Sequence, residues 1–412
     1  MKLLILILLL PFSLIAQVCE KDTSLDWILG EIEQNHPKII LSRLNLEKVE
    51  ADRIEAGKFI NPEVEHFSVW GKEFAGVRSY QNESRLWFTL QLAGKRGKGL
   101  SAWAKQYDMA KHEELMLKQS LLKDLWINFF RIHQIIKETD VRQALILKLN
   151  QVISRYKERR YLTKDQKLEL QIFTMVVNKL SLSLHHLERE KTDILSFFRE
   201  ITAFRCPITK IAAEEKSIQW PDESSLKNLG SVEPLNVELA KLKIETSEAQ
   251  LRLADSKKVP NLRFSPVVQN YINDEVNNTM AGLAFVMPLP IFDTNQSERI
   301  KLHLENKFSQ RNLEVTKNKE EHYFQVKLNK YLNGLSILND MNLVDDGVKI
   351  FEELGSSFAE GKLTISNIVE FCRQLDESLQ YYHYSEAVLM RDLIETYEQK
   401  GKLSAQTLQQ LI

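Results

Sequence analysis

Two long stretches of the chain repeat apolar and polar residues with the period of an α-helix. They run from 96 to 156 and from 295 to 358, and neither contains a proline. In the first stretch, five apolar residues are spaced as in a helical seam: Leu121, Leu125, Phe129, Ile132 and Ile136. At about 1.5 Å per residue, this helix would be about 90 Å long. Such long helices are typical of a coiled coil or a helical tube rather than of a compact globule.

Each long helix is followed by a short turn and a second, returning helix. The returning helices are predicted over 163–204 and 364–400. Both turns begin with an aromatic residue, Tyr156 or Phe358, and both end at a threonine whose hydroxyl can cap the next helix. These threonines are Thr163 and Thr364. In the second turn, Gly361 is suited to a left-handed backbone conformation. The pattern therefore predicts two helical hairpins.

Ahead of each long helix, two shorter segments are predicted to form β-strands joined by a polar loop. In 84–92 and 283–289 apolar residues alternate with other residues, as in a strand with one apolar face. The apolar sets are Leu86, Phe88, Leu90 and Leu92 in the first segment and Leu283, Phe285, Met287 and Leu289 in the second. The partner strands are expected at 63–71 and 261–271, with loops at about 72–83 and 272–279. Four strands are too few to close a barrel, which needs about eight, so these strands would need partner chains.

The order of helix, strand pair and long helical hairpin occurs twice. In each copy two prolines bracket the first helix, because proline suits the first turn of a helix and cannot continue one. These are Pro37 and Pro62 in the first copy and Pro234 and Pro260 in the second. We expect one continuous structural domain, mainly α with a small β part, in which 17–230 form the first repeat and 231–412 the second.

The N-terminus is typical of an exported protein. Lys2 is followed by an apolar run that ends near Ala16, so residues 1–16 are predicted to be a signal peptide. The run is shorter than the roughly 20 residues that a membrane-spanning helix needs. Whether Cys19 carries lipid stays open. No later stretch is long and apolar enough for such a helix, so a mature chain that spans a membrane would need a closed β-barrel.

Composition and charge exclude several functions. The formal net charge is -1, and this gives no field that favours nucleic acid. The nine histidines are scattered without metal-ligand spacing. No nucleophile elbow, phosphate loop or dinucleotide fingerprint occurs. We therefore expect no enzyme activity, no cofactor and no metal site. Cys206 and Cys372 are expected to lie far apart and unpaired.

Three local segments, in this duplicated order, resemble the TolC family of outer-membrane efflux proteins. The segment from Gln91 to Gly97 resembles the turn into the family's long helix, and it is most similar to the heavy-metal and cation branch that includes CzcC and CusC. The segment from Met287 to Phe292 resembles its equivalent in the second copy. The segment from Phe358 to Leu363 resembles the family's aromatic-x-x-Gly turn. The resemblance covers nearly the whole mature chain.

The resemblance implies an outer-membrane exit duct that extends into the periplasm. Three chains with four strands each would close a twelve-stranded barrel in outer-membrane lipid, continued by a periplasmic α-helical barrel. The partners would be two further copies of the chain, a periplasmic adaptor (membrane fusion protein) and an inner-membrane pump of the resistance-nodulation-division type. The duct itself would be passive, and its substrates, possible metal cations included, are not given by the sequence.

The resemblance also implies a periplasmic gate near the second turn. The family's two gate aspartates, counted from Gly361, correspond to Asn367 and Glu370, and its bracing arginine corresponds to Leu363. Three Glu370 carboxylates around a threefold axis would favour cations. Asp165 occupies the corresponding place in the first copy. A solvated helix face is the alternative interpretation of both acids.

A second function class stays open. A periplasmic adaptor or structural coiled-coil protein without a pore would also contain long helical hairpins. Adaptors usually have one hairpin flanked by small β-domains, whereas this sequence predicts two hairpins and no such domains.

Overall fold

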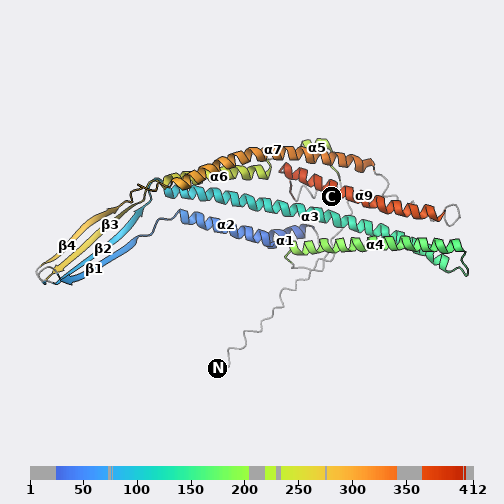
Figure 1. The fold of residues 1–412 in the computed structure, drawn as a ribbon, viewed down its shortest axis with the longest axis horizontal. Coiled ribbons are helices and arrows are strands. Elements are labelled where there is room, and N and C mark those ends of the chain that lie inside the picture. The colour runs from blue at the N-terminus through green and yellow to red at the C-terminus, as the bar shows by residue number, and fades with distance from the viewer. Residues whose placement is uncertain are drawn as a thin grey trace, which may run out of the picture. The chain divides into compact units, whose positions relative to one another are not determined.

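The computed structural model describes residues 25–72, 76, 78–203, 219–228, 233–273, 276–340, 364–401 and 403–404. This part of the chain is mostly helical, with one antiparallel sheet (Figure 1). The helices are α1 (Leu25–Asn35), α2 (Pro37–Ala56), α3 (Lys95–Lys157), α4 (Lys164–Ile201), α5 (Glu223–Lys227), α6 (Leu235–Ser256), α7 (Gln296–Asp340) and α9 (Ile365–Gln399). The strands are β1 (Glu63–Lys72), β2 (Arg78–Leu90), β3 (Leu262–Asn273) and β4 (Asn277–Val286).

The helix predictions agree closely with the structure. The helix predicted over 96–156 is α3, which spans 63 residues and extends one residue further at each end. The prolines act as expected, since α2 begins at Pro37 and α6 begins directly after Pro234. The second long helix is confirmed as far as Asp340. The signal peptide, Cys19, Cys206, Phe358 and Gly361 lie outside the described residues.

The strand boundaries were predicted less well. β2 begins at Arg78, inside the segment predicted as a loop, because its polar first half pairs with β1 although it lacks apolar alternation. β4 likewise begins inside the predicted loop, at Asn277, and it ends at Val286. Met287 and Leu289 therefore follow the strand, where Pro288 and Pro290 cannot donate to a ladder. Leu92 also lies beyond its strand.

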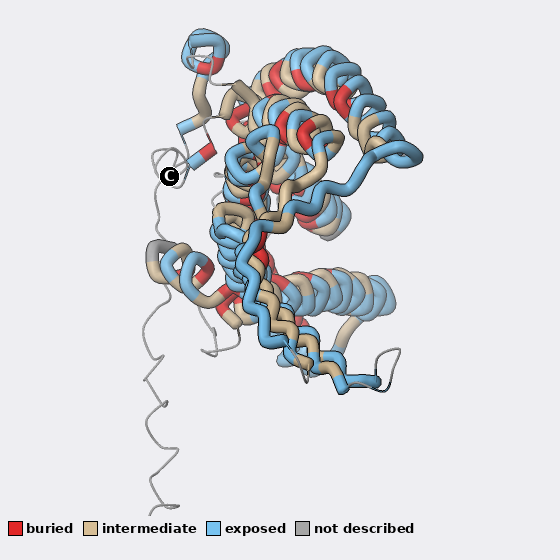
Figure 2. The backbone as a smooth tube through the Cα atoms, turned by 90° about the vertical axis from the view of Figure 1, so that its left-hand side faces the viewer, coloured by how far each residue is buried: buried red, intermediate tan, exposed pale blue. Residues whose placement is uncertain are grey.

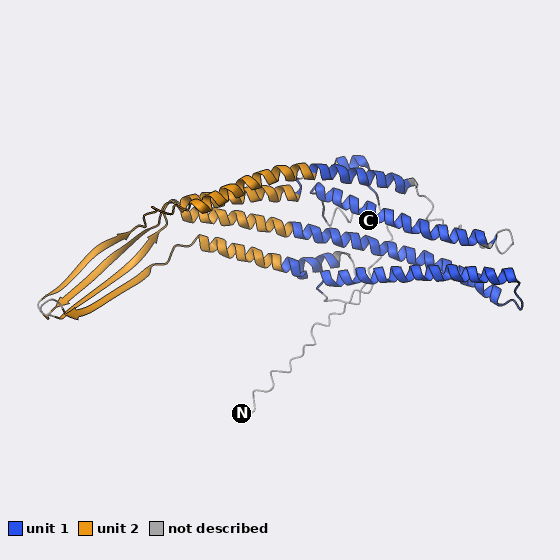
Figure 3. Ribbon diagram, viewed as in Figure 1, with its two compact units in different colours: residues 1–40, 116–234, 321–412 blue, residues 41–115, 235–320 orange. Residues whose placement is uncertain are grey.

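The chain divides into two compact units (Figure 3). Unit 1 comprises residues 1–40, 116–234 and 321–412, and unit 2 comprises 41–115 and 235–320. Unit 2 contains the sheet, most of α2, all of α6 and the sheet-proximal parts of α3 and α7. Each unit takes segments from both predicted repeats.

Unit 1 is held together by two apolar cores. The larger one includes Leu125, Phe198 and Tyr331, all fully buried, and joins α1, α3, α4, α7 and α9. The smaller one, around Leu149 and Phe173, joins α3, α4 and α9. Figure 2 shows the buried residues as bands that recur along the helices, as the periodic pattern predicts. In the predicted seam Leu121, Leu125, Phe129 and Ile132 are buried, and Ile136 is half-buried.

Cys372 belongs to the smaller core. It is a buried free thiol, and burial together with nearby Asp376 raises its pKa to about 12. At neutral pH it is therefore an unreactive thiol that packs like a small apolar side chain.

The helices of unit 2 form a layer in which α3 and α6 are central. Lys105 on α3 pairs with Glu245 on α6 at 2.8 Å between Nζ and Oε2. Asn306 on α7 donates to the hydroxyl of Ser247 on α6 at 2.9 Å.

On the other side of α3, the guanidinium of Arg53 on α2 lies 5.7 Å from the centre of the Tyr107 ring. The helix order α2, α3, α6, α7 is therefore the same as the strand order β1, β2, β3, β4. The reason is covalent, because α2 leads into β1, α3 follows β2, α6 leads into β3 and α7 follows β4. One edge of unit 2 is formed by α2 and β1, and the other by α7 and β4.

The start of α4 carries the predicted threonine cap. The Thr163 hydroxyl accepts from the backbone N–H of Gln166 at 3.2 Å, and the Gln166 side chain accepts from the N–H of Thr163 at 3.1 Å. This is a capping box, which satisfies two otherwise unpaired donors. Thr364 occupies the same position before α9, but its side chain accepts no backbone N–H; its hydroxyl donates to the Asn367 side chain.

The two threonines provide a matched test of this cap. We expect Thr163→Ala to lower the free energy of unfolding by about 1 kcal/mol, because one backbone donor loses its acceptor. We expect a smaller loss for Thr364→Ala. Chemical unfolding followed by circular dichroism measures both, and equal losses would show that the capping box contributes nothing specific.

Candidate channel surfaces

The two faces of the sheet differ in charge and exposure. On the charged face lie Glu63, Glu65, Glu83, Arg85, Trp87 and Arg263. On the apolar face lie Leu86, Phe88, Leu90, Leu262, Phe264, Val268, Leu283 and Phe285. Along β2 and β3 the residues of the charged face are half-buried or buried, whereas most residues of the apolar face are more exposed. The side chains of the charged face are therefore the more closely crowded.

The charged face is a network of ion pairs around one tryptophan. Trp87 is only 6% exposed, and its Nε1 donates to Glu65 Oε2 at 2.6 Å. The guanidinium groups of Arg85 and Arg263 lie 5.9 and 5.0 Å from its ring centres, a cation–π arrangement. Arg263 donates to Glu63 at 2.6 Å. These charges are satisfied within the chain.

The apolar face joins the apolar residues predicted separately for the two copies. Phe88 of the first copy stacks on Phe264 of the second at 5.3 Å between ring centroids, and Phe264 lies opposite Phe285 in the register. Phe285 is 63% exposed, and Leu283 is 71% exposed. A sheet with paired charges on one face and exposed apolar residues on the other suits a sheet whose apolar face meets an apolar medium.

Polar side chains in the middle of the apolar face bond to one another. His66 Nδ1 and the Ser84 hydroxyl are 2.9 Å apart, and the Ser68 hydroxyl donates to Asn82 Oδ1 at 2.9 Å. The Ser68 hydroxyl also lies 2.9 Å from His66 Nε2. Because these groups have partners within the sheet, they depend less on water for their hydrogen bonds.

Both edges of unit 2 expose apolar residues on their helices. On α7, Ile300, Leu304, Phe308 and Val315 form a stripe with helical spacing, and each is more than half exposed. On α2, Leu41, Leu44 and Ile54 are likewise more than half exposed. Exposed apolar stripes at both edges are typical of surfaces that another chain covers.

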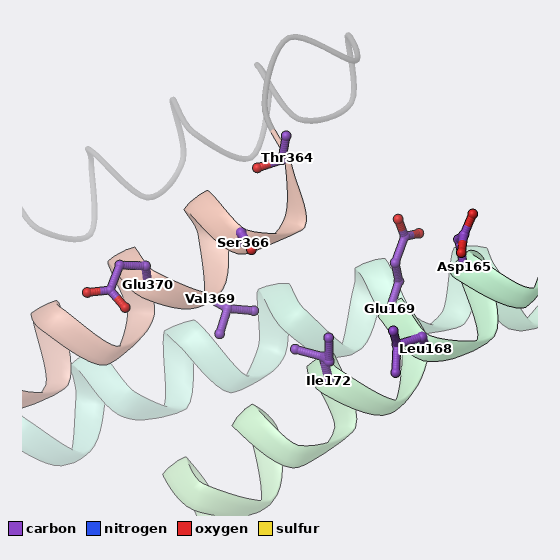
Figure 4. A pocket seen from close by; sticks show the side chains of 8 residues that line it. All are labelled: Asp165, Leu168, Glu169, Ile172, Thr364, Ser366, Val369 and Glu370. Carbon is purple, nitrogen blue, oxygen red and sulfur yellow. The ribbon is translucent and has the colours of Figure 1, made fainter.

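The residues predicted for the gate lie near the start of α4 and α9 in unit 1. A hollow of about 500 Å³ separates these helix ends (Figure 4). It is lined by Asp165, Leu168, Glu169 and Ile172 of α4 and by Thr364, Ser366, Val369 and Glu370 of α9. The structure therefore brings Asp165 and Glu370 to one hollow, although they are far apart in sequence. Asn367 is exposed beside it and does not line it.

Glu370 is largely compensated by its own helix. The Arg373 guanidinium donates to both of its oxygens, at 3.0 and 2.5 Å, and Gln374 donates at 2.8 Å. These bonds, first that from Arg373, lower the pKa of Glu370 to about 2. Arg373 also pairs with Glu377. The group Glu370, Arg373 and Glu377 thus keeps one net negative charge per chain.

Tyr156, predicted as part of the first turn, anchors that turn. It is buried, and its ring lies 6.2 Å from that of Phe173 between centroids. Its hydroxyl donates to Glu169 at 3.0 Å. Burial first, and then this bond to a carboxylate, raises the pKa of Tyr156. Glu169 and Arg373 were not singled out from the sequence, although the spacing of Glu370, Arg373 and Glu377 is that of helix ion pairs.

A buried ionic network in unit 1 was not predicted at all. Arg142 is 1% exposed, and it donates to Glu138 and to Asp376, each at 2.8 Å. Arg131 extends the network, donating to Glu138 at 2.8 Å and to both oxygens of Glu190. The network therefore ties α3 to α4 and to α9. No local pattern could reveal it, because Arg142 and Asp376 are 234 positions apart.

The described residues lack two further features. None of their helices is sufficiently long and apolar to cross a membrane. Within the same residues, no group of three or more His, Cys, Asp or Glu side chains is placed to hold a metal ion.

Comparisons with known proteins place this fold. No protein-family model and no curated protein matches the sequence. Solved structures do match, among them a membrane protein from Pseudomonas aeruginosa, with 11% identity, a TM-score of 0.73 and coverage of 92% of this chain and 91% of that one. The chain has the fold of outer-membrane channels. CusC, whose structures concern folding and transmembrane channel formation, is also similar, with 12% identity, a TM-score of 0.68 and coverage of 91% of each chain. The CmeC outer membrane channel of Campylobacter jejuni is similar too, with 10% identity, a TM-score of 0.70 and coverage of 92% of this chain and 85% of that one. The mainly α, TolC-like fold expected from the sequence is thereby confirmed.

Proposed function

We propose that this protein is the outer-membrane exit duct of a tripartite efflux system and a member of the TolC family. It would act without catalysis and conduct substrates passively from an inner-membrane pump and a periplasmic adaptor to the outside. The observation that carries this proposal is the sheet of unit 2, with exposed apolar residues on one face and mutually paired charges on the other. In a fold shared with outer-membrane channels, that sheet suits a wall between lipid and a water-filled lumen.

The edges of unit 2 support the homotrimer that the family resemblance implies. β1 and β4 are the outer strands of the sheet, and in lipid an unpaired strand edge is costly. Pairing β1 of one copy with β4 of the next would close twelve strands from three chains and leave no edge. The same operation brings the exposed stripe of α2 against that of α7. One contact would thus cover both the strand edges and the apolar helix edges.

Two features bear on the cargo. The cation branch of the family, suggested by the segment from Gln91 to Gly97, would carry metal ions. The 12% identity to CusC differs little from the 10–11% to the other channels, so it does not favour that branch. The acids of the hollow, Asp165, Glu169 and Glu370, favour cations over anions.

The same acids would form the periplasmic gate, with Glu370 as its main charge and Asn367 beside it. Because Arg373 lowers its pKa to about 2, Glu370 stays ionised well below its ordinary pKa of 4.5. In Arg373→Gln that pKa would rise toward 4.5. As the pH falls from 4.5 toward 2, Glu370 of the variant should therefore take up a proton, whereas the wild-type carboxylate stays ionised beside its arginine.

Reversal potentials in planar lipid bilayers measure the cation preference of the channel. At neutral pH the variant should be more cation-selective than the wild type, since a positive charge is gone and Glu370 is ionised in both. At a pH between about 2 and 4.5 this excess should disappear, because protonated Glu370 leaves the variant with the same local charge as the wild-type ion pair. The double variant Arg373→Gln with Glu370→Gln is the control, and it should lack this change at acidic pH. Identical pH profiles for the single and the double variant would exclude Glu370 as the titrating group.

Fractionation tests the function itself. The full chain should be found in outer-membrane fractions as a trimer that dissociates only on heating before electrophoresis. A monomer in the soluble periplasmic fraction would overturn the duct and favour the adaptor or coiled-coil alternative. Metal sensitivity of a deletion strain tests the cargo separately, since a duct for other substrates would leave metal tolerance unchanged.

A further inference from the structure

The far end of the apolar face carries an aromatic and cationic group. Trp70 lies opposite Tyr80, and Lys72 lies opposite Arg78, in the β1–β2 register. Because side chains alternate along a strand, all four lie on the apolar face. Together with Ile272 and its neighbours they line a hollow of about 480 Å³. We call these four residues the end cluster.

Within the described residues, the cations of the end cluster have no counter-charge. Among the described residues, neither Lys72 nor Arg78 has a carboxylate partner, whereas Arg85 and Arg263 on the charged face are both paired. Like charges directly opposite each other on neighbouring strands repel. Lys72 and Arg78 lie opposite each other beside two aromatic rings, and they pair with no carboxylate of the described residues. This arrangement suits an anionic group bound between the two cations.

The depth of the end cluster in a membrane indicates which kind of anion it would meet. β2 has 13 residues, so its ends are about 40 Å apart at about 3.3 Å per residue. With a strand tilt of about 40°, this corresponds to about 30 Å along the membrane normal, the thickness of the hydrocarbon core. If Leu90 lies at one boundary, Lys72 and Arg78 lie at the other, among lipid phosphates. Trp70 and Tyr80, one alternation further in, then lie where aromatic belts occur.

From this juxtaposition we infer that the end cluster binds the phosphate of an anionic membrane lipid. Lys72 and Arg78 contact the phosphate oxygens, and Trp70 and Tyr80 pack against the adjoining glycerol or sugar and upper acyl chain. The inference rests on the proposed function, because it requires the sheet to lie in a membrane. It adds a lipid-binding site to the outer surface of the duct, one in each chain.

Lipid binding to the purified full chain tests the site. Phosphatidylglycerol and phosphatidylcholine are added in detergent, and the lipids bound per trimer are counted by native mass spectrometry. The test variant is Lys72→Gln with Arg78→Gln. The control is Lys111→Gln with Lys243→Gln, which removes the same charge from exposed positions on α3 and α6. We expect the test variant to bind phosphatidylglycerol about 30-fold more weakly, since each surface cation contributes about a factor of five. The control should bind like the wild type.

Each other outcome has a defined meaning. Unchanged binding by the test variant overturns the site, and so does equal wild-type affinity for the anionic and the zwitterionic lipid. Complete displacement by excess inorganic phosphate would assign the cluster to a free anion and overturn the lipid. Trimer formation and insertion into vesicles are measured in parallel. Their failure in the wild type would sink the proposed function and this site with it, whereas intact trimers with unchanged lipid binding would sink the site alone.

Discussion

Replacing Arg142 by methionine is expected to lower the free energy of unfolding by about 3–5 kcal/mol, the cost of breaking a buried ion pair from one side. Arg142 is 1% exposed and lies between the carboxylates of Glu138 and Asp376, themselves nearly inaccessible. Asp376 accepts a hydrogen bond from Arg142 through Oδ1, and within the described residues its Oδ2 has no hydrogen-bond partner. Without Arg142, a buried carboxylate would be left without compensation.

A second substitution separates lost pairing from lost packing. In the double variant Arg142→Met with Asp376→Leu, two apolar side chains replace the ion pair, and Glu138 keeps its bond from Arg131. We expect most of the lost stability to return, because replacing both partners removes the uncompensated charge. If the double variant is no more stable than the single one, the packing of the arginine stem stabilises the fold more than its charge does.

The matched control is an exposed ion pair. Arg311 pairs with Glu314 at 2.8 Å, but both side chains are more than 60% exposed. Arg311→Met should cost at most about 1 kcal/mol, as exposed pairs do. Unfolding of each variant in detergent, followed by circular dichroism, gives the comparison. Equal losses for Arg142→Met and Arg311→Met would contradict a structural role for the buried network.

Replacing Phe308 by glutamate is expected to abolish the trimer and leave the chain folded. Phe308 is 72% exposed on the α7 stripe, so it contributes little to the core of its own chain. In the proposed trimer it would be covered by α2 of the next copy, and a carboxylate there would be buried without a partner. Heat-modifiable migration should change from trimer to monomer, while the helix content by circular dichroism stays constant.

Lys317→Glu is the control for this substitution. It places the same carboxylate on the same helix nine residues further on, on the opposite side of α7 at about 100° per residue, at an exposed position. The trimer should persist. A trimer that survives Phe308→Glu would show that the α7 stripe is not the contact between copies, and a variant without helical structure would show that Phe308 serves the fold of one chain.

Local patterns were sufficient for the helices. α3 could be predicted to within one residue at each end because its period, its lack of proline and its flanking segments are all properties of neighbouring residues. The same holds for the Thr163 cap, which requires residues only three positions apart. The alternation of Leu86, Phe88 and Leu90 also gave the apolar face of β2 correctly.

Contacts between distant residues decided the rest. β2 extends to Arg78 because β1 pairs with its polar half, and a ladder satisfies backbone groups whatever the side chains are. The partner of Glu370 is Arg373 on its own helix, whereas the family's bracing arginine would follow the turn, where this chain has Leu363. The gate role that the resemblance assigns to Glu370 stays a prediction. The bond from Arg142 to Asp376 depends on α3 and α9 lying against each other.

The sequence by itself therefore determined the elements of this protein: long helices, paired strands, their duplication and the apolar side of β2 and β4. These features depend on periodicity and on proline, which act over one or two turns of chain. Only the tertiary structure decided that the apolar faces of both copies lie on one side of one sheet, that the charges crowd on the other, and that the edges of unit 2 expose apolar stripes. Those features depend on the register between segments about 200 residues apart, and no local period encodes that register.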